Sequence, residues 1–151
     1  MTDADSLSGP IIRPIIRMYR DSDFDGVDRL WRRVFPDDPR RNSAPQSIPR
    51  KLAFQGELFF VATLGSAVIG TVMAGYDGHR GWLYSVAVDP DHRRAGIGKA
   101  MVRHAERALR DLGCDKINLQ VRERNASVVA FYESLGYAVE PVLGMGRYFG
   151  P

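Results

Sequence analysis

The stretch that decides the fold is VAVDPDHRRAGIGKA at residues 86–100. An apolar segment ends at a proline turn, a basic loop follows, and a helical pattern starts at about Gly98. The first turn of a helix offers unpaired N–H groups and about half a positive charge. Glycine at positions 96 and 98 leaves that backbone open to a ligand. The loop also carries the cations Arg93, Arg94 and Lys99. The pattern therefore predicts a pyrophosphate site where a strand joins a helix.

The spacing of these glycines excludes two common phosphate-binding motifs. The GxxxxGK[ST] spacing of a P-loop is missing, and Met101 stands where the dinucleotide motif has its third glycine. The alternative is an ordinary strand-to-helix turn that uses glycine for its geometry. The full spacing Arg93-x-x-Gly96-x-Gly98, between a strand and an amphipathic helix, favours the anion site.

The sequence outside this stretch predicts alternating strands and helices. Strands are expected at 15–19, 58–63, 67–76, 82–88, 116–121, 137–139 and 144–149. Helices are expected at 21–35, 47–55, 98–112 and 126–135, with Asp21 and Asn125 as N-caps. Residues 1–10 are expected to be a disordered lead-in and residues 11–151 a single domain. This order predicts an α/β (α+β) fold, with helices on both faces of a mixed sheet.

Composition excludes several classes of protein. The chain has 151 residues, of which 44% are hydrophobic, so it can bury a core and is not disordered. No apolar run approaches ~18 residues, and the acidic N-terminus is unlike a signal peptide. A single cysteine, Cys114, excludes an internal disulfide and predicts a reducing cytoplasm. No Cys/His cluster has zinc spacing, so no metal is expected.

Charge is concentrated in two basic stretches, although the net charge is only +3. Residues 32–51 and 93–111 each hold six Lys or Arg and two acids, whereas 52–92 hold one Arg and four acids. The stretches predict an anionic ligand or partner, or else two solvated helical faces. No nucleic-acid recognition motif is present, so nucleic acid is not the expected partner. His104 is expected to face outward, and Cys114 to be buried.

Two motifs carry a resemblance to a known family. Arg93-x-x-Gly96-x-Gly98 after an apolar strand resembles motif A of the GNAT superfamily of acetyl-CoA-dependent N-acetyltransferases. Residues 125–137 resemble the family's N-x-x-A-x-x-F-Y-x-x-x-G-[F/Y] segment, with Val128 where alanine is common. The resemblance covers about residues 11–149 and is strongest over 82–137. It is most similar to small stand-alone bacterial members, including the ribosomal-protein N-terminal-alanine type.

This resemblance implies a fold and a cofactor. The fold would be a mainly antiparallel mixed sheet of about six to seven strands, splayed in the middle, with about four helices. The cofactor would be acetyl-CoA, with its pantetheine arm pairing with the main chain of Val86, Ala87 and Val88 like a guest strand. The pyrophosphate would be wrapped by Arg93, Arg94, Ala95, Gly96, Ile97, Gly98, Lys99 and Ala100. Asn125 would bind the pantetheine, or else cap its helix. The resemblance also suggests a homodimer, because members of this family are often dimeric.

Catalytic roles follow from the same resemblance. Tyr132 matches the tyrosine near the cofactor sulfur, where a phenol can protonate the leaving thiolate; the alternative is a core aromatic. No carboxylate lies on the two splayed strands, and Gln120 stands where the ribosomal-protein type usually has its Glu. A base therefore remains unassigned. Water relayed through Tyr84, Ser85 or Gln120 is one route, and Glu123, Asp77 and His79 are weaker candidates.

The acceptor is expected to bind beside the first helix and the loop that follows it. Candidate contacts are Trp31, Phe35, Tyr76, Tyr84 and Gln120, with the arginines at 32, 33, 40 and 41. A basic rim favours an acceptor that carries a carboxylate or phosphate. The sequence thus predicts acetyl transfer to a primary amine of a small molecule or peptide, in a ternary complex. The alternative is a non-catalytic acetyl-CoA-binding module.

Overall fold

The computed structural model describes residues 13–150. The chain divides into two compact units, one ending at Leu119 and the other starting at Gln120, and each is described by itself. The expected disordered lead-in at 1–10 lies outside the described residues.

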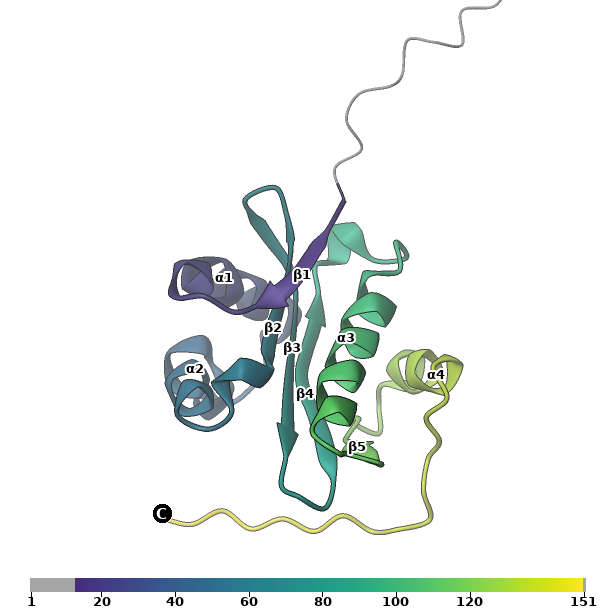
Figure 1. The fold of residues 1–151 in the computed structure, drawn as a ribbon. Coiled ribbons are helices and arrows are strands. Elements are labelled where there is room, and N and C mark those ends of the chain that lie inside the picture. Colours follow the sequence, from purple (N-terminus) through teal and green to yellow (C-terminus); the bar gives the residue numbers. More distant parts are fainter. Residues whose placement is uncertain (1–12, 151) are drawn as a thin grey trace, which may run out of the picture. The chain divides into compact units, whose positions relative to one another are not determined.

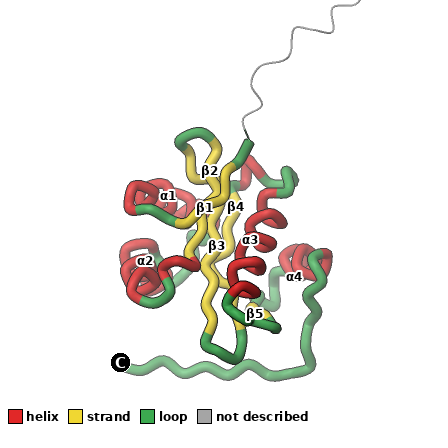
Figure 2. Tube along the Cα trace, viewed as in Figure 1, coloured by secondary structure: helices red, strands yellow, loops and turns green. Residues whose placement is uncertain are grey.

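The first unit is built on a five-stranded mixed sheet in the order β1-β2-β3-β4-β5 (Figures 1 and 2). Its strands are β1 (Ile15–Met18), β2 (Phe59–Leu64), β3 (Ala67–Tyr76), β4 (Gly81–Val88) and β5 (Ile117–Leu119). The first four strands pair antiparallel, and β5 lies parallel to β4. The predicted mixed, mainly antiparallel sheet is therefore confirmed.

The expected number of strands, about six to seven, is wrong. In the second unit, α4 (Ala126–Ser134) forms as predicted, but residues 137–139 and 144–149 form no strand. Most of their apolar side chains are exposed, with Val139 77% and Met145 97% accessible. Alternating apolar residues make a strand only where a neighbour pairs with the backbone, and glycine and proline weaken the pattern here.

Helices cover both faces of the sheet in the first unit (Figure 1). They are α1 (Phe24–Val34), α2 (Ala44–Ala53) and α3 (Ile97–Asp111), with 3-10 turns η1 (Asp21–Asp23), η2 (Arg40–Asn42), η3 (Gly56–Leu58) and η4 (Pro90–His92). Helices α1 and α2 share one face, where their core side chains are Val27, Leu30, Trp31, Ala44 and Ile48. Helix α3 packs on the other face with Met101, Val102, Ala105 and Leu109 buried.

Close packing of α3 on β3 depends on Gly70. A Cβ at this position would lie 2.6 Å from the sulfur of Met101 and 3.2 Å from the carbonyl oxygen of Ala87. Because real Cβ atoms do not approach so closely, glycine lets α3 reach the sheet. This contact sets the height of the first turns of α3 above the strands.

Three local expectations need correction. Asp21 lies in η1, and it is Asp23 that precedes α1 and accepts hydrogen bonds from the Arg20 backbone and the Arg17 guanidinium. Helix α2 starts three residues earlier than expected, because Pro45 suits a first helical turn. His104 does not face outward: its ring packs edge-on against Phe60, with 4.6 Å between centroids.

A β-bulge interrupts the pairing of β3 with β4. Thr71 pairs with Ala87 and Met73 pairs with Tyr84, so β4 contains one extra residue, and Ser85 has a φ of 50°. The Thr71 hydroxyl holds this bulge, because it donates to the carbonyl oxygen of Ser85 at 2.9 Å and accepts from the Trp31 indole at 2.8 Å. One buried hydroxyl therefore joins α1, β3 and the bulge.

Replacing Thr71 by Val should destabilise the protein by about 1–3 kcal/mol, because the buried Trp31 N–H and Ser85 carbonyl both lose their partner. Urea unfolding measures the change. Thr63→Val on β2 is the matched control, since Thr63 is also buried but has no such bridging role, and it should shift the midpoint little. Equal losses in the two variants would contradict the role given to Thr71.

Candidate active site

Strand β4 has an open edge in its second half. Its ladder with β5 covers only Gly81, Trp82 and Leu83, whereas its pairing with β3 continues to Val88. Backbone groups after Leu83 therefore have no β5 partner, because β5 ends at Leu119. The predicted splay of these strands stays a prediction, and Val86, Ala87 and Val88 lie along the open edge. An extended ligand can add to this edge as a guest strand.

The open strand leads directly into a basic helix N-terminus. Strand β4 ends at Val88, η4 follows, and α3 starts at Ile97. Gly96 adopts a φ of 77°, which glycine accepts without strain, and its carbonyl accepts the first helical hydrogen bond from Ala100. The side chains of Arg93, Arg94 and Lys99 are exposed around it. The first N–H groups of α3 and these cations fit the pyrophosphate of acetyl-CoA.

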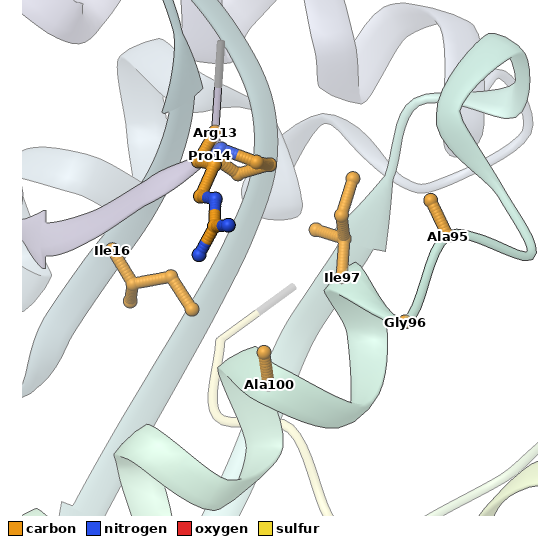
Figure 3. A pocket seen from close by; sticks show the side chains of 7 residues that line it. All are labelled: Arg13, Pro14, Ile16, Ala95, Gly96, Ile97 and Ala100. Atoms are coloured by element: carbon orange, nitrogen blue, oxygen red, sulfur yellow. The ribbon is translucent and has the colours of Figure 1, made fainter. Parts of the chain in front are cut away.

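A pocket of about 250 Å³ lies beside this helix N-terminus (Figure 3). On one side it is lined by Ala95, Gly96, Ile97 and Ala100, four of the residues predicted to bind the cofactor. On the other side it is lined by Arg13, Pro14 and Ile16, and Figure 3 shows the Arg13 guanidinium between Ile16 and α3. Sequence reasoning missed Arg13, because nothing in the local pattern links the start of β1 to the start of α3.

Ion pairs tie the loop before α3 to α1. Arg33 reaches Asp89 at 2.9 Å and Asp91 at 3.1 Å. The guanidinium lowers the pKa of Asp91, and hydrogen bonding to Asp91 raises the pKa of Arg33. Asp89 also accepts from the backbone N–H of Asp91, which shapes η4. Arg33 was expected on the acceptor rim, but here it positions the loop that precedes the anion site.

The second unit carries Asn125, Tyr132 and Gln120. Asn125 is exposed and occupies the predicted N-cap position of α4, but its side chain accepts from the Ser127 hydroxyl at 3.3 Å and makes no capping hydrogen bond to the helix backbone. Tyr132 is 7% exposed, and its ring packs against Phe131 and Tyr137 with centroids 5.0 and 5.6 Å away. This burial raises the pKa of Tyr132 to about 12. Gln120 is exposed.

The remaining acceptor candidates do not share one surface. Trp31 is a core residue, 4% exposed, so the structure places it under the bulge and not on an acceptor surface. Phe35 packs against the same core. Tyr76 is partly buried, with its hydroxyl 3.4 Å from the carbonyl oxygen of Gly113. Tyr84 is 42% exposed on β4 and is the candidate nearest to the open edge.

Residues 13–150 were also compared with the requirements of a metal site and of a membrane-spanning helix. Within residues 13–150, no group of three or more His, Cys, Asp or Glu is placed to hold a metal ion. No helix of that part of the chain is long and apolar enough to cross a bilayer. Cys114 is buried, as predicted, and its thiol donates to the carbonyl oxygen of Lys116 at 3.3 Å.

An unpaired strand edge that leads into a basic helix N-terminus suits the extended arm and the phosphates of a coenzyme A thioester. Residues 24–137 match the family described as "Acetyltransferase (GNAT) family". The chain therefore belongs to the GNAT acetyltransferase family. It is an N-acetyltransferase, and acetyl-CoA is the acetyl donor of that family.

Individual relatives agree with this assignment. The chain is similar to an acetyltransferase of Yersinia enterocolitica, with 40% identity over 87% of this chain and 93% of the relative. Its fold is similar to that of the PaiA N-acetyltransferase from Thermoplasma acidophilum in complex with coenzyme A (TM-score 0.76, 19% identity, 88% and 94% covered). It is also similar to the ribosomal-protein-S18-alanine N-acetyltransferase from Escherichia coli (TM-score 0.67, 27% identity, 82% and 77% covered).

Replacing Arg33 by Met should weaken acetyl-CoA binding about two- to fivefold, because exposed ion pairs position the loop but contribute modestly. Isothermal titration measures the dissociation constant. Arg32→Met is the matched control: Arg32 is the next residue of α1 and pairs only with Asp28 of its own helix. Equal affinity in the Arg33 variant and the wild type would show that these ion pairs do not position the cofactor loop.

Proposed function

We propose that the enzyme transfers the acetyl group directly to a primary amine while both substrates are bound. The observation that supports this most strongly is the open edge of β4, which continues into the N-terminus of α3. An unpaired strand edge followed by a helix N-terminus can hold one extended thioester ligand. Among the described residues Cys114 is the only thiol, and it is buried and hydrogen-bonded, so a covalent acetyl-cysteine intermediate has no support.

The chain's own residues bind and orient the cofactor. Main-chain groups of Val86, Ala87 and Val88 would pair with the pantetheine arm, and the backbone N–H near Val88 would supply a hydrogen-bond donor for the thioester carbonyl oxygen. The residues from 93 to 100 surround the pyrophosphate, and the exposed Asn125 amide contributes to the pantetheine. When bound, acetyl-CoA supplies an activated acetyl group and a thiolate leaving group.

Tyr132 is the proposed general acid. Its burial keeps the phenol protonated at neutral pH, since its pKa is raised to about 12. A protonated phenol can donate to a departing thiolate, which would otherwise return to the carbonyl carbon. The aromatic neighbours Phe131 and Tyr137 fix the direction of the ring. This role makes Tyr132 necessary for turnover but not for cofactor binding.

The proposed acceptor is a primary amine that also carries an anionic group. Arg40 and Arg41, in η2 after α1, are exposed arginines that suit a carboxylate or phosphate and disfavour a polyamine. Similarity to the Escherichia coli enzyme keeps the N-terminus of a protein among the acceptors, although Gln120 cannot accept a proton as a glutamate would. The single buried cysteine suits a reducing cytoplasm.

Tyr132→Phe should reduce kcat by about 10²-fold or more, because general-acid catalysis typically contributes that much. Thiol release from acetyl-CoA measures turnover over a panel of amines: a peptide with a free N-terminus, lysine, glucosamine 6-phosphate and spermine. Tyr19→Phe is the matched control, since Tyr19 stacks on Phe59 away from the proposed site. Acetyl-CoA affinity should stay unchanged in both variants.

Two outcomes would contradict the proposed function in different ways. Normal turnover of Tyr132→Phe would remove the general-acid role alone. Tight acetyl-CoA binding by the wild type with no thiol release for any amine would favour a binding module without catalysis.

A further inference from the structure

One amine in the first unit has no role in the site described so far. Lys51 lies in the last turn of α2 and is only 5% exposed, although lysine is seldom so deeply buried without an acidic partner. Within the described part of the chain no carboxylate forms an ion pair with it. Its Nζ donates a hydrogen bond to the main-chain oxygen of Ala74 on β3. Burying a charged amine is costly, so this position favours an amine that can become neutral.

The amine lies against the strand that carries the open edge. Nζ of Lys51 is 5.2 Å from the centre of the Tyr84 ring, and Tyr84 directly precedes the bulge in β4. The end of the neighbouring strand β3 is held in place, because the Gln55 side chain forms hydrogen bonds with both the N–H and the carbonyl oxygen of Tyr76, each at 2.8 Å.

Tyr84 provides the connection to solvent. Its ring is 42% exposed, while the Lys51 amine lies behind it. Two residues further along β4 begin the main-chain groups that we assign to the pantetheine arm. An acceptor amine bound beside Tyr84 would exchange a proton with the covered Lys51 amine through bridging water rather than by direct contact, a route that general bases use.

We propose that Lys51 is the proton acceptor for the ammonium group of the acceptor substrate, a role that rests on the proposed function. The neutral amine donates one N–H to Ala74 and directs its lone pair elsewhere. No carboxylate on β4 or β5 is needed for this step. Lys51 thus takes the role of the base, for which the sequence offered only a water relay or the weaker candidates Glu123, Asp77 and His79.

The protonation state of Lys51 supports this role. Burial lowers its pKa to about 8, against the opposing effect of Glu57 from η3. On β4 the facing titratable group is Tyr84, whose pKa is itself raised by burial. Of the other elements packed against α2, α1 carries charged side chains of both signs, and η2 carries only arginines: Asp25, Asp28, Arg29, Arg32 and Arg33 in α1, and Arg40 and Arg41 in η2. Near pH 8 a substantial fraction of Lys51 is therefore neutral and able to accept a proton.

Lys51 and Tyr132 together account for every proton that moves in the reaction. An N–H bond of the ammonium breaks and its proton passes to Nζ of Lys51, leaving a neutral amine. The amine nitrogen bonds to the acetyl carbon as the C–S bond breaks, and the thiolate takes a proton from Tyr132. The amide nitrogen loses its second proton, which restores the Tyr132 phenol, and Lys51 releases its proton to solvent. The sum is an ammonium and a thioester giving an amide, a thiol and one proton.

The test is the pH dependence of kcat/KM, measured with the panel amine that gives the fastest thiol release. The kcat/KM of the wild type should increase with pH, with a step near pH 8. Lys51→Met should lose this step and fall about 10²-fold or more. Lys51→Arg keeps the charge and a hydrogen bond to Ala74 but cannot lose its proton at these pH values, so it should fall equally. Arg50→Met, at the neighbouring exposed position of α2, should keep the wild-type rate and profile.

A second measurement does not depend on activity. Below pH 8 Lys51 is protonated in both the folded and unfolded states, and the cost of burying its charge is fully present. Between about pH 8 and its ordinary pKa of 10.5 the unfolded state binds more protons, so stability rises with pH. The free energy of unfolding of the wild type should therefore increase relative to Lys51→Met across this range.

Each outcome bears on a separate claim. If Lys51→Arg retains the rate and the step near pH 8, the lysine is only structural and the inference is overturned. If the unfolding difference is flat from pH 8 to 10.5, Lys51 does not titrate as the inference requires. If the wild type releases no thiol with any amine, the proposed function fails and this role fails with it, whatever the unfolding data show.

Discussion

The hydroxyl of Thr71 joins three elements on which the binding path depends. It accepts the Trp31 indole N–H from α1 and donates to the Ser85 carbonyl at the bulge of β4. The bulge adds one residue to β4 only, and bulges bend a strand and increase its local twist. Strand β5 pairs with β4 over the first three residues of β4 and no further. The bulge therefore fixes the course of the unpaired part of β4 that leads to α3.

The electrostatics of the site are arranged for a ligand that brings its own negative charge. Exposed cations at Arg93, Arg94 and Lys99 stay hydrated until a pyrophosphate arrives, so the free chain bears little cost for holding them. The α3 N-terminus adds fixed N–H donors in the same direction. The carboxylates that might oppose such a ligand, Asp89 and Asp91, are paired with Arg33. The same ion pairs connect the cofactor loop to α1, next to the expected acceptor side.

Local patterns predicted the elements that bear the site. Strand β3 has the predicted bounds, and β4 and α3 lie within a residue of theirs, because each has a clear apolar period and a glycine or proline at its end. Segments 137–139 and 144–149 share the apolar character of strands but have no neighbour to pair with, and a sequence pattern does not contain that information. The expectation of a splay between β4 and β5 came from family resemblance alone, and nothing in the local sequence at Ser85 signals the observed bulge.

Single side chains were the least predictable features. The local sequence fits Trp31 equally well to the surface or to the core. Only its hydrogen bond to Thr71, which lies 40 residues further along the chain, places it in the core. Lys51 looks like any solvated lysine at the end of a helix, because its burial depends on β3 and β4 and not on α2. Arg33 and Arg13 owe their positions to residues distant in sequence. Long-range contacts decide such cases, and periodicity reports only which face of an element is apolar.

The central claim is that acetyl-CoA is held by the main chain of the open β4 edge and by the first turn of α3. Hydrogen–deuterium exchange of the full chain with and without acetyl-CoA tests it most directly. The account predicts slower exchange at the amides of residues 86–88 and 96–100 on binding, with no change in the β1–β2 pairing. Protection confined to other segments, or binding that leaves both of these stretches unchanged, would contradict it.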